Sequence, residues 1–118
     1  MAFNVRIFGY RGMTQLPVTL PKQFASDAVY QLTQPYEWRE TVSATGAAAS
    51  TAAQAAPDQT RIVRIEVPDG ETIRYEINPP NRSGGAVVAG ANSPSLSGIN
   101  HFEFAQGWTI SIIDAAGL

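Results

Sequence analysis

The sequence contains no cysteine. That absence excludes a disulfide scaffold, a thiolate metal site and a cysteine nucleophile. Charge is scarce as well, because only 15% of the 118 residues are charged and the net charge is −2, whereas soluble proteins average about 25% charged residues. A protein that binds nucleic acid by neutralising phosphates needs a surplus of positive charge. We therefore expect no nucleic-acid partner.

Long hydrophobic runs are missing too. The longest stretches of low polarity are short and rich in Ala or Gly, well below the ~20 residues that span a membrane. Residues 1–6 lack the basic start and apolar stretch of a secretory leader. We expect no membrane partner and a product made in the cytoplasm. A length of 118 residues fits one domain with its own core.

Signatures of catalysis are absent from the sequence. His101 is the only histidine, and no Gly-x-Ser-x-Gly motif marks a nucleophile. Ser83-Gly84-Gly85 lacks the lysine and the helix of a phosphate-binding loop. Neighbouring carboxylates such as Glu37 and Glu40 fit solvated strand positions as well as acid–base chemistry. We expect no enzyme activity, no catalytic residues, no cofactor and no bound metal.

The dominant pattern is an alternation of apolar and polar residues, which is typical of half-buried strands. The clearest runs are 3–8, 36–42, 63–67, 73–77 and 108–112. Weaker strands are expected at 16–20 and 28–33, and 86–89 is a candidate for a short one. Eight prolines fall near the ends of these runs. The pattern predicts an all-β domain, a small sandwich or barrel of roughly 6–8 short strands with long loops.

The two clearest strands, 63–67 and 73–77, flank Pro68-Asp69-Gly70 and predict a β-hairpin. In that pairing one arginine of each strand lies opposite the other, with a glutamate on each diagonal. Two interpretations stay open: a lattice of surface ion pairs, each worth less than about 1 kcal/mol, or an arginine pair that engages a partner's carboxylate. The candidate contact residues here are Arg64, Arg74, Glu66 and Glu76.

Two segments break the strand pattern, one near 43–57 and one near 78–100. Eight of the thirteen residues in 44–56 are alanine and none is charged, so a mobile loop, a short helix and an arm ordered by a partner remain alternatives. Fifteen of the 23 residues in 78–100 are Gly, Pro, Ser or Asn. Long loops of this kind are functional or disordered. Their candidate contact residues are Ala47, Ala48, Ala49, Val87 and Val88.

Aromatic residues and arginines bear on the kind of partner. Tyr36, Trp38 and Trp108 lie in strand patterns, where aromatic residues are more often core than sugar-binding platforms. A carbohydrate- or ligand-binding β module is the alternative, in which Trp38, Tyr36 or Trp108 is exposed. Arginine outnumbers lysine seven to one, a bias found at protein interfaces and also produced by genome composition.

This combination resembles the small β-rich auxiliary virion proteins of tailed bacteriophages, in particular capsid decoration or cement proteins. The likeness lies in a cysteine-free, lysine-poor β chain with an uncharged Ala/Ser/Thr segment at 42–56 and a Gly/Ser/Asn/Pro loop at 84–94. The resemblance implies a structural protein that stabilises the phage head through inter-subunit contacts. It implies a homo-oligomer, trimer or dimer, that binds the major capsid protein or other virion subunits and ends in the virion. A head–tail or tail component has a similar sequence.

Overall fold

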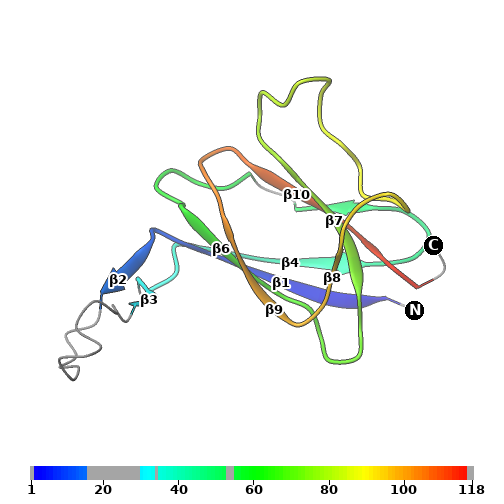
Figure 1. The fold of residues 1–118 in the computed structure, drawn as a ribbon, viewed down its shortest axis with the longest axis horizontal. Helices are drawn as coiled ribbons and strands as arrows, with labels where there is room; N and C mark the ends of the chain where they lie inside the picture. The colour runs from blue at the N-terminus through cyan, green and yellow to red at the C-terminus, as the bar shows by residue number, and fades with distance from the viewer. Residues whose placement is uncertain (1, 16–29, 34, 53–54, 117–118) are drawn as a thin grey trace, which may run out of the picture.

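The computed structural model describes residues 2–15, 30–33, 35–52 and 55–116. Every regular element in this part of the chain is a β-strand (Figure 1). The strands are β1 (Phe3–Tyr10), β2 (Met13–Gln15), β3 (Tyr30–Leu32), β4 (Trp38–Ala44), β5 (Ser50–Thr51), β6 (Ile62–Glu66), β7 (Ile73–Asn78), β8 (Ser95–Leu96), β9 (Ile99–Glu103) and β10 (Thr109–Asp114).

Eight of these strands form two antiparallel sheets that enclose one core. The first sheet has the order β4-β1-β6-β9 and the second has the order β5-β10-β7-β8. Alternate residues of each strand point inward, so the branched side chains meet between the sheets. The fully buried members of this core include Val5, Ile7, Val63, Ile65, Ile73, Ile110 and Ile112. The predicted all-β sandwich is confirmed, with a strand at each of the five clearest runs.

The predicted hairpin between 63–67 and 73–77 is wrong. β6 pairs with β1 and β9, whereas β7 pairs with β10 and β8. The turn between them carries the chain from one sheet to the other, with Gly70 at φ +80° and the Glu71 N–H donating to Pro68 O at 3.1 Å. Alternation specifies which face of a strand is buried but not which strand lies beside it. The two apolar faces therefore oppose each other across the core.

Part of the Ala-rich segment 43–57 belongs to the sandwich. Its start completes β4, and β5 pairs with β10 as an edge strand. The Ala52 and Ala56 N–H groups donate to the carbonyls of Ile110 and Trp108 at 3.1 and 2.9 Å. Ala44, Ala52 and Ala56 are buried, which shows that three of the alanines fill space in the core. The described residues of this segment contain no helix.

The segment 78–100 is held against the second sheet by polar side chains. The Ala89 N–H donates to Ser111 Oγ at 3.0 Å. Because Ile110 and Ile112 face the core, Ser111 faces outward from β10, yet the loop leaves it only 2% exposed. The chain at 86–89 is not a strand, and the segment ends in β8 and the start of β9, which the alternation did not predict.

A two-stranded arm extends beyond the sandwich. β2 pairs with β3 and with no strand of either four-stranded sheet. Figure 1 shows that it prolongs the ribbon formed by β1 and β4, past the end of the two layers. The predicted strand at 28–33 contains β3, and its first two residues lie outside the described part of the chain, as does the prediction at 16–20. This ribbon is called the β2–β3 arm below.

Candidate interaction surface

The outer faces of the two sheets differ in what covers them. On the second sheet, Arg74 Nη1 donates to Ser93 O at 2.9 Å, and Ser93 Oγ donates to Glu76 Oε2 at 2.6 Å. Ser93 is buried, as is Ser111, so the loop seals this face. On the first sheet, outward-facing side chains of three strands are exposed: Arg6, Arg39, Thr41, Ser43 and His101. The first sheet therefore presents the larger regular surface to a partner.

One row across the first sheet combines cations with an aromatic ring. The strand registers place Arg39 opposite Phe8, Phe8 opposite Arg64, and Arg64 opposite His101. Arg39 and His101 are exposed, and neither has a polar partner within the described residues. The row contains no carboxylate. These four residues are called the cationic row below. The guanidinium of Arg39, which has no partner within the described residues, can bind a carboxylate through two parallel hydrogen bonds.

The next row toward the β6–β7 turn is neutralised internally. Arg6 Nη2 lies 2.6 Å from Glu66 Oε1, and Arg64 Nε lies 2.9 Å from Glu66 Oε2. The second contact is an ion pair whose angles do not make a hydrogen bond, because Arg64 Nε is buried without an acceptor in hydrogen-bonding geometry. One carboxylate thus serves two arginines, whose side chains are 63% exposed for Arg6 and 33% exposed for Arg64.

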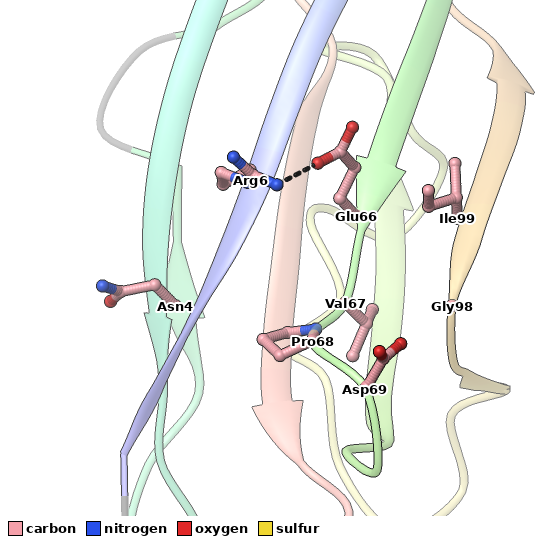
Figure 2. Close-up of a pocket in the computed structure, with 8 residues that line it drawn as sticks. All are labelled: Asn4, Arg6, Glu66, Val67, Pro68, Asp69, Gly98 and Ile99. Atoms are coloured by element: carbon pink, nitrogen blue, oxygen red, sulfur yellow. Dashed lines mark ion pairs between the residues drawn. The ribbon is translucent and has the colours of Figure 1, made fainter.

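A groove of about 430 Å³ lies beside this ion pair. Figure 2 shows Arg6 and Glu66 facing each other from neighbouring strands, with Pro68 and Asp69 further along the same chain as Glu66. Ile99 forms the opposite wall and is 56% exposed. The groove therefore offers charged and apolar contacts together at the edge of the surface.

Tyr36 adds an aromatic patch beside the cationic row. Its ring contacts Phe8 edge-on at 5.3 Å and Tyr10 at 6.5 Å between centroids. Trp38 pairs with Gly9 and Leu32 pairs with Met13, so the chain that carries Tyr36 is two residues longer between these pairs than the chain opposite. This bulge, which includes Pro35, places Tyr36 over the outer face. Tyr36 remains 40% exposed.

Glu37 fixes the base of the β2–β3 arm. Its N–H donates to Gly9 O at 2.9 Å, and its Oε1 accepts from the buried Thr60 hydroxyl at 2.8 Å. Arg11 Nε donates to the other carboxylate oxygen at 3.3 Å. These contacts tie together the two connections between the arm and the sandwich, at Arg11 and Glu37, and the chain before β6, at Thr60.

The structure does not bring the sequence-predicted contact residues together. Arg64 and Glu66 lie on the first sheet, whereas Arg74 and Glu76 lie on the second and hold its loop. The predicted diagonal ion pairs are absent because the hairpin is absent, and Glu76 instead lies 3.7 Å from Arg82 Nη1. The other candidates occupy the β4–β5 turn and the loop: Ala47, Ala48, Val87 and Val88 are exposed, and Ala49 is half-buried.

Sequence reasoning missed most of the surface residues named above. Nothing in the sequence marked Phe8 and His101 as surface-contact residues, because only the strand registers place them in one row with Arg39. Trp38 and Phe104 lie in the core as expected for strand aromatics, whereas Tyr36 does not. Of the two strands of the arm, only β3 was predicted, within the weak strand at 28–33, and the sequence did not show that β3 lies outside the sandwich.

Two further findings concern metals and membranes. The described residues contain no group of three or more His, Cys, Asp or Glu placed to hold a metal ion. Across 2–15, 30–33, 35–52 and 55–116, no helix is long and apolar enough to cross a membrane. Comparisons with protein-family models, with curated proteins and with solved structures found no significant match.

Proposed function

We propose that this chain is a structural protein of a bacteriophage virion, a capsid decoration or cement subunit that stabilises the phage head through contacts with the major capsid protein and with its own copies. The sequence resemblance supports this function. The observation in the structure that carries it is the β2–β3 arm, which leaves the sandwich and, among the residues that the structure describes, has no strand of either four-stranded sheet beside it.

An isolated two-stranded ribbon is only marginally stable in water, because it has no second layer on which to bury its side chains. Met13, in β2, is 55% exposed. A ribbon of this kind gains stability when another molecule covers it or adds a strand to its edge. Such an arm suits a subunit that works by many weak contacts on a repetitive particle, where multivalency multiplies their effect.

The test compares particles made with and without the chain. Particles lacking it should release their DNA at a lower temperature on heating, and supplying the chain in trans should restore the original temperature. Met13→Asp should restore it less well, because a charge in the arm opposes burial against the capsid. Ser83→Asp, at an exposed loop position, is the matched control and should restore it fully. An unchanged release temperature without the chain contradicts the proposal.

The alternative class is a carbohydrate- or ligand-binding module, and one observation favours it. Tyr36 is exposed over the outer face of the first sheet, beside Phe8. The other two rings that could serve this alternative are less accessible, because Trp38 is buried and Trp108 is half-buried against Phe104. One exposed ring offers a sugar little stacking area, so the structural role has more support.

A further inference from the structure

We propose that the cationic row of one copy binds the acidic β6–β7 turn of a second copy, so that the chain associates with itself head to tail. The row is formed by Arg39, Phe8, Arg64 and His101. The turn is Pro68–Glu71 and carries two carboxylates. This inference rests on the proposed function, because a particle-coating subunit is the class of protein that needs a directional contact between copies.

The turn has the chemistry that the row lacks. Asp69 is exposed and Glu71 is half-buried, and neither carboxylate has a cationic partner among the residues that the structure describes. The turn joins the two sheets at one end of the sandwich, where Figure 1 shows it as a protruding loop. Its shape is fixed by the Glu71 N–H bond to Pro68 O and by the positive φ of Gly70. A rigid acidic tip loses little entropy on binding.

The row has the composition of an interface centre rather than of a solvated sheet. Arginine and aromatic residues are enriched at interfaces, and here Arg39 and Arg64 flank Phe8 on neighbouring strands. Arg39 has no partner within the described residues, so a carboxylate from outside gains a charge-assisted pair without displacing an existing one. The exposed Tyr36 adds an apolar contact beside it.

The carboxylates of the β6–β7 turn cannot reach the cationic row of their own chain. Asp69 follows Arg64 by five residues, and the strand leads away from the row toward the turn, which separates the two by roughly 15 Å. One copy therefore offers both surfaces at once. A contact between two different surfaces repeats from copy to copy and gives a ring where the rotation closes and a filament where it does not.

Two other occupants fit the charges less well. Two copies of the row facing each other across a twofold axis bring like charges together, which is unfavourable. A nucleic acid meets Glu66, Glu37 and Glu103 on and around the same face, and these carboxylates repel phosphates. The carboxylates on the second copy's turn meet Arg39, which has no carboxylate partner within the described residues.

The experiment measures the mass of the purified full chain by light scattering after size exclusion, over a wide range of concentration. The native chain should exceed the mass of one copy and grow with concentration. Arg39→Glu should weaken self-association at least about tenfold, the loss expected when one close charge pair is replaced by repulsion. Asp69→Lys combined with Glu71→Lys should weaken it as much.

Mixing these two variants gives the decisive result. Arg39→Glu keeps the native acidic turn and the turn variant keeps the native row, so the mixture should recover two-chain complexes that neither variant forms alone. Arg61→Glu and Asp58→Lys make the same charge changes at exposed positions outside both surfaces and should leave association unchanged.

A native chain that keeps the mass of one copy at every concentration overturns the inference, as does a mixture that stays unassociated. Binding of duplex DNA that Arg39→Glu abolishes also overturns it, in favour of a nucleic-acid surface. These measurements need no virus particles. Failure of the self-contact is therefore distinguishable from failure of the proposed function, which is read on particles.

Discussion

The side-chain amide of Asn78 takes the place of a neighbouring strand for Val87. Asn78 Nδ2 donates to Val87 O at 2.9 Å, and Asn78 Oδ1 accepts from the Val87 N–H at 2.8 Å. Arg82 Nη1 donates to the same Oδ1 at 3.1 Å. Asn78 is only 4% exposed, so one buried side chain at the end of β7 satisfies both main-chain polar groups of Val87, a residue that belongs to no strand.

Replacing that amide should release the loop. Asn78→Ala leaves the Val87 N–H and carbonyl without their partner, and we expect the free energy of unfolding to fall by about 2 kcal/mol. Hydrogen exchange at Val87 should speed up more than at Ile112 in the core, because the loop opens locally. Urea denaturation and exchange rates measure the two effects. The matched control is Asn92→Ala, at an exposed asparagine of the same loop, which should leave both unchanged.

The course of the chain between β6 and β7 can be tested with cysteines, since the sequence has none of its own. Arg64 and His101 are Cα partners on neighbouring strands, so Arg64→Cys with His101→Cys should form a disulfide under mild oxidation. Arg64→Cys with Arg74→Cys should keep both thiols, because these residues lie on the outer faces of different sheets. Titration of free thiols distinguishes the outcomes, and an efficient 64–74 disulfide restores the hairpin.

Close contact at Gly9 makes that position intolerant of a side chain. A Cβ there meets Trp38 Cε3 at 3.0 Å, Trp38 Cβ at 3.1 Å and the Thr60 methyl at 3.2 Å. We expect Gly9→Ala to lower the free energy of unfolding by roughly 1–3 kcal/mol through overpacking. Gly90→Ala is the control, because nothing lies within 4 Å of its Cβ position. Equal midpoints of urea denaturation for the two variants would contradict the close packing of Trp38 and Thr60 against Gly9.

Tryptophan fluorescence distinguishes the structural role from the carbohydrate-binding alternative. Trp38 is 6% exposed and contacts Phe104, which also contacts Trp108. Blue-shifted emission that resists soluble quenchers and does not respond to added sugars is the expected result. Red-shifted emission that changes on adding an oligosaccharide supports the binding module instead.

The sequence predicts the sandwich but not its connections. Alternation in runs such as 63–67 identified inward-facing residues correctly, because burial of one strand face is a local property. Strand neighbours depend on which apolar faces meet, and nothing in the order Val63–Ile65–Val67 indicates β1 rather than β7 beside it. β9 was not predicted because Asn100 and His101 interrupt its apolar pattern. Phe102 and Phe104 nevertheless face the core.

The candidate surface was harder to foresee for the same reason. Arg64 was singled out by its own strand, but its neighbours Phe8, Arg39 and His101 come from three other segments and meet only through register. The predicted hairpin, which is wrong, placed Arg74 opposite Arg64. The actual partner of Arg74, the Ser93 carbonyl, belongs to a loop whose composition gave no indication of where it lies.

The most direct test of the proposed function is the number of copies of this chain in purified virus particles. Particles from the bacterium that carries the gene are banded on a density gradient, and the chain is quantified against the major capsid protein by mass spectrometry. We expect a constant, whole-number ratio across the particle band. A chain that stays in the soluble fraction, with none in the band, contradicts the proposal.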